Sequence, residues 1–169
     1  MERVATITLN PAIDSACEAE HVSATDKIRT FAERYDPGGG GLNVARVLHR
    51  FGVPVEAIYL SGGPTGALLD GLLDEAGLPR RAIHIADHTR MSLAVFERST
   101  GHEYRFIPEG PDVAEHEWRA LLGACFASPA EWVVASGSLP RGVPEDFFAR
   151  RTEGRAGSGR ALPRQAEHR

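Results

Sequence analysis

Short apolar runs alternate along the chain with segments of helical periodicity, and this alternation constrains the fold more than any other feature of the sequence. Runs rich in β-branched residues, typical of buried strands, occupy 4–9, 55–60, 81–86 and 131–136. Apolar residues recur at helical spacing over 44–51, 68–76 and 118–126. Strands that alternate with helices predict an α/β fold with a mostly parallel sheet.

Polar, turn-forming sequences follow three of these runs. They are "NPAID" at 10–14, "SGGPTG" at 61–66 and "SGSLPRG" at 136–142. Ligands of open α/β sheets bind beyond the carboxyl ends of the strands. We therefore expect the three turns to lie on one rim of the sheet and to carry a ligand site.

Two segments, 15–35 and 88–107, interrupt the alternation because both are rich in β-forming residues and partly polar. The second contains two strand-like runs separated by "STG", a pattern typical of a hairpin. A small separate sheet, standing off the main layer, would accommodate both segments.

The stretch "DPGGGGLNVARVLHRFG", residues 36–52, places four glycines directly before a helix. Val44, Val47, Leu48 and Phe51 predict the apolar face of that helix, and the glycines ahead of them are expected outside it. Such a loop at a helix N-terminus can bind an anion or a polar ligand. A plain linker before a core helix remains an alternative, because the run matches neither a P-loop nor the G-x-G-x-x-G spacing.

Composition excludes several other classes. The chain of 169 residues suits one domain, and its net charge of −4 gives no attraction to nucleic acid. Its two cysteines, Cys17 and Cys125, lack metal-ligand spacing, so no metal site is predicted. No apolar stretch approaches the length of a membrane span, and no signal peptide is recognisable. We expect a cytoplasmic protein with no membrane partner.

Taken together, the motifs resemble the ribokinase/PfkB family of carbohydrate kinases, and in particular its phosphofructokinase branch. Gly38 to Gly62 is similar to the first family signature, and "TLNPAID" and "SGSLPRGV" are similar to two further motifs. The resemblance covers 1–150 in order. It implies a ribokinase-like three-layer sandwich with a mostly parallel sheet and a β-sheet lid, whose segments are about 15–35 and 88–107. It also implies ATP-dependent phosphorylation of a hexose phosphate, with fructose 6-phosphate as the expected substrate.

The resemblance assigns the sugar site to residues on the predicted rim. Gly39, Gly40 and Asn43 would contact sugar hydroxyls, and Asp14 would accept hydrogen bonds from them, since a carboxylate forms the stronger, charge-assisted kind. Ser138 would lie at a strand end near the substrate. Without the family, Asp14 could simply cap a turn and Asn43 could be a helix N-cap.

The resemblance further assigns the phosphate to basic residues of the lid. Arg90 and Arg105 match positions that hold the sugar phosphate, a role that suits a planar guanidinium. Lys27 and Arg29 lie on the lid segment that pairs with a second subunit in relatives, so a homodimer through the lid is implied. Without the family, all four could be ordinary exposed charges.

The second half of the family pattern is not found in this sequence. No G-A-G-D motif occurs, so no catalytic residue is assigned, and ATP and Mg, which the intact family enzyme uses, have no predicted ligands. We expect a truncated domain over 1–150. The tail, 151–169, is interpreted as an aberrant reading frame or as a disordered basic segment. A non-catalytic sugar-phosphate-binding module, or a module that forms a heterodimer, is the alternative function.

Overall fold

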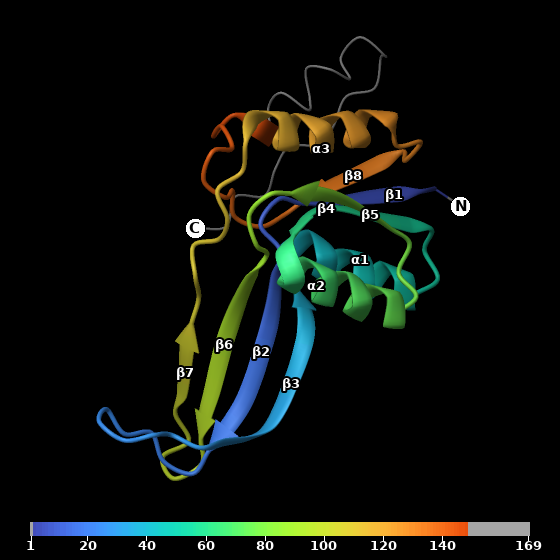
Figure 1. Cartoon of the computed structure of the whole chain (residues 1–169). Coiled ribbons are helices and arrows are strands. Elements are labelled where there is room, and N and C mark those ends of the chain that lie inside the picture. The colour runs from blue at the N-terminus through green and yellow to red at the C-terminus, as the bar shows by residue number, and fades with distance from the viewer. Residues whose placement is uncertain (1, 149–169) are drawn as a thin grey trace.

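The main sheet of the computed structural model, which describes residues 2–148, is parallel throughout (Figure 1). Its four strands lie in the order β5-β4-β1-β8. Their bounds are Arg80–Ile85 for β5, Val55–Gly62 for β4, Val4–Thr8 for β1 and Trp132–Ala135 for β8. The predicted parallel α/β architecture is therefore confirmed, with β8 at an edge of the sheet within the described residues.

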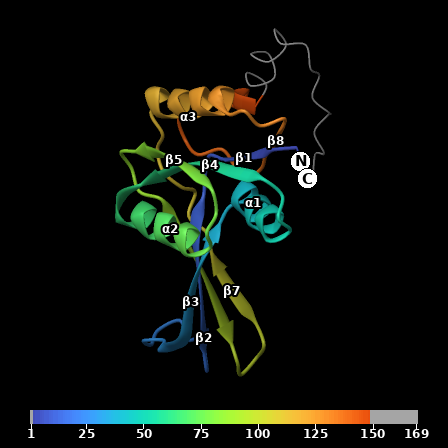
Figure 2. The same ribbon diagram turned by 90° about the vertical axis from the view of Figure 1, so that its right-hand side faces the viewer.

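Helices cover both faces of this sheet. Figures 1 and 2 show α1 and α2 on one face and α3 on the other. The helices span Gly40–Arg50, Gly63–Glu75 and Glu115–Ala127 respectively. Alternate residues of β4 point to the two sides, so that Ile58 packs with Trp118 and Leu121 of α3, whereas Tyr59 packs with the other two helices. This is the expected three-layer sandwich.

The prediction of which residues form the buried face of α1 was partly wrong. Val47 and Phe51 are 50% and 80% exposed, whereas Gly41, Leu42 and Ala45 are buried against the sheet. The helix also begins at Gly40, inside the glycine run that was expected to lie outside it. Small residues let the helix approach β1 closely, and a pattern of large apolar side chains does not reveal such a contact.

Two predicted turns are shorter than expected. Of "NPAID", only the first residues bend, because β2 begins at Ala12 and Asp14 is already within the strand. Helix α2 begins at Gly63, within "SGGPTG", with Pro64 in its first turn. Proline is favourable there because the first helical N–H groups have no intrahelical partner.

A second four-stranded sheet, referred to below as the lid, projects from the first (Figures 1 and 2). Its order is β3-β2-β6-β7, with bounds Thr30–Gly38, Ala12–Ala19, Arg90–Glu97 and Glu103–Phe106. Only β2 and β6 pair in parallel; the other two pairings are antiparallel. The predicted small sheet is thus confirmed, and its last two strands form the predicted hairpin.

A polar network fastens α2 to the main sheet at Tyr59, whose ring is fully buried. The Tyr59 hydroxyl donates to Asp70 Oδ1 at 2.6 Å, and Arg80 Nη1 donates to the hydroxyl at 3.2 Å. Arg80 also forms two bonds of 2.8 Å to Asp74. Burial, followed by the neighbouring Asp70 carboxylate, raises the pKa of Tyr59, so the phenol stays protonated and remains a donor.

Replacing Tyr59 with phenylalanine is expected to lower the free energy of unfolding by about 1–3 kcal/mol. The ring is retained, but the partly buried Asp70 loses a donor and Arg80 an acceptor. Urea unfolding of both proteins measures the difference. Equal midpoints would show that the network adds nothing to stability.

A buried carboxylate closes the end of the lid that lies far from the helices. Glu97, at the end of β6, has a side chain only 2% exposed. Its oxygens accept hydrogen bonds from the Val22 backbone N–H and from the Thr100 and Tyr104 hydroxyls. These bonds, the one from Thr100 most of all, lower the pKa of Glu97 from an ordinary 4.5 to about 2.

This lowered pKa predicts acid sensitivity of the lid. The stabilisation from ionised Glu97 is fully present above pH 4.5 and is lost as the pH falls toward about 2. The difference in free energy of unfolding between the parent protein and Glu97→Gln should therefore shrink over that interval. Comparing the two proteins cancels the other titrating groups that they share. A difference that is constant with pH would contradict the prediction.

No helix within residues 2–148 is both long and apolar enough to cross a membrane. The predicted tail, 151–169, lies outside the described residues.

Candidate functional site

Three chain segments meet beyond the carboxyl end of β1. Asn10, just after this strand, donates from Nδ2 to the Glu109 carbonyl at 2.8 Å and to Ser138 Oγ at 3.1 Å. The Gly41 N–H donates to the Ser136 carbonyl at 3.2 Å. The turns after β1 and β8 therefore lie on one rim, as predicted for these two, and the start of α1 joins them there.

The glycines of this rim lie against the strands. Gly39 is the N-cap of α1 with φ +116°, and a Cβ there would lie 2.8 Å from Thr8 Cγ2. A Cβ on Gly40 would lie 2.4 Å from Ser136 Oγ. Asn43 is exposed in the first turn of α1, where its N–H donates to the Gly39 carbonyl at 2.9 Å. The alternative that Asn43 is merely the N-cap is wrong, because Gly39 occupies that position.

Asp14 stands on β2 with its carboxylate exposed beside the glycine loop. The Ser92 hydroxyl donates to its Oδ1 at 2.6 Å. A Cβ on Gly38 would lie 2.2 Å from Oδ2, so the glycine run passes directly over this carboxylate. The alternative that Asp14 caps a turn is wrong, because the residue lies within a strand.

Arg90 begins β6 and is partly buried between the two sheets. Its Nη1 donates to the Pro108 carbonyl at 2.9 Å and its Nη2 to the Asn10 carbonyl at 3.1 Å. Nε is buried without a partner among the described residues. Burial lowers the pKa of Arg90, against the opposing effect of Asp14. The guanidinium thus places a positive charge at the rim and links the segment after β1, at Asn10, to the segment after β7, at Pro108.

The strand registers place Arg105 on the same lid face as Asp14. Paired residues share a face, and alternate residues along a strand return to it. Ala16 is two residues beyond Asp14 on β2 and pairs with Ala94, which pairs with Arg105 of β7. The Arg105 side chain is 67% exposed, and its Nε lies 3.6 Å from a carboxylate oxygen of Glu103.

Lys27 and Arg29 are not brought together with the other predicted residues. Both are exposed on the loop that joins β2 to β3. Figure 1 shows this loop at the end of the lid opposite the helices, whereas the rim lies where the lid meets the main sheet. Within one chain, these two cations are therefore remote from Asp14.

Sequence reasoning missed Asn10, Ser92 and Gly38. Asn10 was quoted within a motif but was assigned no role, although its amide holds two loops of the rim. Ser92 has no local signal, because only the pairing of β2 with β6 places it beside Asp14. The need for glycine at position 38 likewise depends on the strand opposite.

The described part of the chain contains no group of three His, Cys, Asp or Glu side chains that could hold a metal ion. We assign neither Mg²⁺ nor ATP ligands among residues 2–148.

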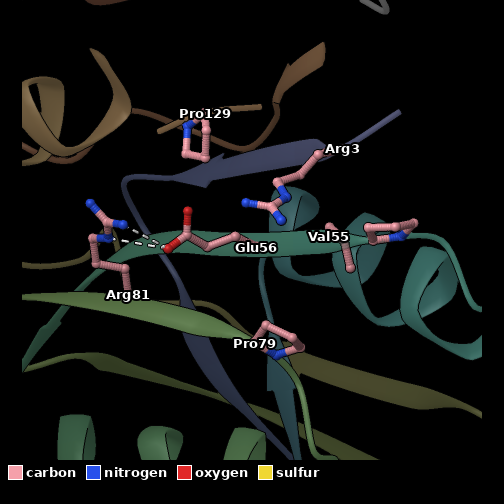
Figure 3. A pocket seen from close by; sticks show the side chains of 7 residues that line it. Arg3, Val55, Glu56, Pro79, Arg81 and Pro129 are labelled. Atoms are coloured by element: carbon pink, nitrogen blue, oxygen red, sulfur yellow. Dashed lines mark hydrogen bonds and ion pairs between the residues drawn. The ribbon is translucent and has the colours of Figure 1, made fainter. Parts of the chain in front are cut away.

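A separate pocket of about 380 Å³ lies at the opposite, amino-terminal end of the main sheet (Figure 3). Glu56 lies within it and pairs with Arg81 at 3.0 Å, while Arg3 points in from β1's side. Three prolines complete its walls. None of the predicted site residues lines this pocket, so it does not belong to the candidate site.

Comparison with protein families gives a match between residues 7–158 and the family model described as pfkB family carbohydrate kinase. The match covers most of the chain, including every residue of the rim and of the lid.

Individual relatives agree with this match. The chain is 49% identical over 152 residues to the ATP-dependent 6-phosphofructokinase isozyme 2 of Mycobacterium tuberculosis, covering 88% of this chain and 44% of that protein. The structure of Escherichia coli phosphofructokinase-2 in complex with fructose-6-phosphate superposes with a TM-score of 0.87 at 34% identity, over 94% of this chain and 53% of that one. The tetrameric inhibited form of that enzyme gives 0.86, again at 34% identity and over the same shares. The chain thus spans about half the length of the relatives it matches.

Proposed function

Because the chain belongs to the pfkB family of carbohydrate kinases, we propose that it carries the sugar-phosphate-binding part of an ATP-dependent hexose phosphate kinase. Fructose 6-phosphate is the proposed substrate, since a similar structure is described in complex with that sugar. The observation that carries the proposal is the convergence of Asp14, the glycine loop and Arg90 on one rim. In the proposed domain, residues 1–150 form the N-terminal part.

The sugar hydroxyls would be bound by the carboxylate and the glycine loop. Asp14 Oδ1 already accepts from Ser92, which fixes the carboxylate and leaves further lone pairs for hydroxyl donors. Gly39 and Gly40 have no side chain between the loop backbone and the sugar, and Asn43 presents an exposed amide beside them. Ser138, held by Asn10, would line the far side.

The phosphate would be bound by the arginines on the same lid face. Arg90 is preorganised, because two backbone carbonyls hold its guanidinium in place. Arg105 lies farther along that face with an exposed side chain, so it can reach toward a phosphate without breaking a buried bond. Two guanidinium groups suit a dianionic phosphate through paired hydrogen bonds. ATP, when bound, supplies the phosphoryl group; these residues hold the acceptor.

Calorimetric titration of the full chain with fructose 6-phosphate tests the proposal, with fructose and inorganic phosphate as controls. Binding of fructose 6-phosphate alone, with neither control producing heat, supports a sugar-phosphate site. A coupled assay for ADP release then separates two functions. Turnover identifies a complete kinase, whereas binding without turnover identifies a binding module. Absence of binding at millimolar ligand would refute the proposed site.

We propose further that two copies associate through the lid. One row of paired residues crosses the lid on the face opposite Asp14: Tyr35, Ser15, Leu93 and Phe106. Leu93 and Phe106 are 38% and 60% exposed. Three of these four side chains, Tyr35, Leu93 and Phe106, are aromatic or aliphatic, and their exposure on an open sheet favours self-association. A similar enzyme is described in a tetrameric form, which supports assembly within the family.

Replacing Leu93 with aspartate is expected to convert the dimer to a monomer, because the charge would be buried without a partner at the interface. Sedimentation velocity measures the change. Leu68→Asp is the matched control, since Leu68 is similarly exposed, at 42% against 38% for Leu93, but lies on α2 rather than on a lid strand. A parent protein that is already monomeric at micromolar concentration would contradict the proposed assembly.

A further inference from the structure

The loop from residue 20 to residue 29 carries two exposed cations, one of which is a lysine. Lys27 is the only lysine of the chain, among 19 lysine and arginine residues. Lys27 and Arg29 are both exposed, and no described residue pairs with either charge. An unpaired cation on a long side chain has no fixed position of its own, so its location depends on how the loop is anchored.

The loop is anchored at its start by β6 and the turn that follows. The Arg98 N–H donates to the Ala19 carbonyl at 2.9 Å, and the Ser99 N–H to the Glu20 carbonyl at 3.1 Å. These two bonds continue the parallel pairing of β2 with β6 beyond the ends of both strands. The first loop residues therefore lie directly beside Glu97.

The carboxylate of Glu97 contacts both the loop and the hairpin. Oε1 accepts from the Val22 N–H at 2.8 Å and lies 2.8 Å from His21 Nδ1, both in the loop, and it also accepts from the Ser99 hydroxyl of the hairpin at 3.3 Å. Oε2 accepts from Thr100 Oγ1 at 2.6 Å and from the Tyr104 hydroxyl at 3.1 Å, so it binds the β6–β7 hairpin. A single buried carboxylate thus joins the loop to the hairpin.

We propose that Glu97 is a positioning residue, which fixes the 20–29 loop on the β6–β7 hairpin and so orders Lys27 and Arg29, the two cations that the family resemblance assigns to a substrate site. The proposal rests on the proposed function for its ligand. The anchoring of the loop does not depend on that function, because it follows from the contacts of Glu97 alone. The low pKa of Glu97 agrees with an anchor that stays ionised at neutral pH.

The single lysine provides a direct test of the anchor. A lysine-specific endoprotease can cut the chain only after Lys27, so its rate under native conditions reports opening of the loop. Glu97→Gln should raise this rate by about tenfold, because the amide keeps the shape but loses the charge and one acceptor. Glu20→Gln is the matched control, since Glu20 is exposed in the same segment, and it should cleave at the parent rate.

Cleavage after Arg119 by an arginine-specific protease shows whether the effect is local. Arg119 lies on α3, remote from the lid, so its cleavage reports global unfolding and should rise less in Glu97→Gln than cleavage after Lys27 does. If that variant does not fold, Thr100→Ala removes one donor at an exposed position and should give a smaller increase after Lys27. Unchanged cleavage after Lys27, or equal increases at Lys27 and Arg119, would overturn the proposal.

Sugar phosphate binding tests the functional part. Glu97→Gln and Lys27→Ala should each raise the Kd for fructose 6-phosphate, and the double variant should be little weaker than Lys27→Ala alone, since both changes remove the same contact. Fully additive effects would overturn this part. If the parent chain binds no sugar phosphate, the proposed function fails, and the proteolysis result alone decides the role of Glu97.

Discussion

Replacing Arg90 with alanine is expected to weaken the binding of fructose 6-phosphate by about 2 kcal/mol, or roughly thirtyfold in Kd. The guanidinium is the most deeply placed cation of the rim, and burial has already removed part of its hydration. A phosphate meets a group that is partly desolvated and held by two carbonyls, so little ordering is needed on binding. Isothermal titration calorimetry measures the change.

Two comparisons make the Arg90 result specific. Arg119→Ala removes an exposed arginine from α3 and should leave Kd unchanged. Arg90→Lys keeps the charge but cannot replace both carbonyl contacts and a phosphate contact together, so its Kd should fall between those of the parent and Arg90→Ala. If Arg90→Ala bound the sugar phosphate as tightly as the parent, Arg90 would have only a structural role between the Asn10 and Pro108 segments.

Replacing Gly41 with alanine is expected to lower the free energy of unfolding by about 1–3 kcal/mol and to abolish the glycine-loop site. The added Cβ would lie 2.5 Å from the Ile7 carbonyl oxygen and 3.0 Å from the Ile7 carbonyl carbon. Both atoms belong to the backbone of the central strand, so neither can move aside. The helix must shift instead, and Gly39 and Gly40 shift with it. Chemical unfolding gives the stability change, and calorimetry gives the loss of binding.

Gly71→Ala is the matched control for Gly41. Gly71 lies within α2, and a Cβ there meets nothing within 4 Å. Because alanine is the better helix former, this variant should be more stable than the parent by up to about 1 kcal/mol. Equal stabilities of the two alanine variants would show that the contact between α1 and β1 is looser than the structure indicates.

The elements of the fold were predictable because their signals are local. Strand runs, the helical spacing of leucines and the "STG" turn each depend on neighbours in sequence, and all correspond to observed elements. The prediction errors occur where the burial of a residue depends on the other element against which it packs. Val47 and Phe51 have helical spacing, yet Gly41, Leu42 and Ala45 face the sheet, and at Gly41 the backbone of Ile7 leaves no room for a Cβ.

The candidate site likewise contains residues that could be predicted from the sequence and residues that could not. Asp14, the glycine loop and Arg90 could be named from motifs, and the structure places them together. The supporting groups could not be named. Ser92 contacts Asp14 only because of the register of β2 with β6, and Glu97 accepts hydrogen bonds from both the β2–β3 loop and the β6–β7 hairpin. Such contacts require a pairing that hydrophobic periodicity does not encode. The roles of Lys27 and Arg29 stay predictions, since they depend on a second chain.

The order β5-β4-β1-β8 also affects how the chain can fold during synthesis. The first strand to leave the ribosome is a central one: Val4 pairs with Val55 on one side and with Trp132 on the other. One hydrogen-bonding edge of β1 therefore stays open until almost all of the described chain has emerged. Pairings of such long sequence separation form slowly and leave apolar strands exposed meanwhile. Nascent chains stalled before residue 132 should consequently depend more on chaperones than chains stalled after it.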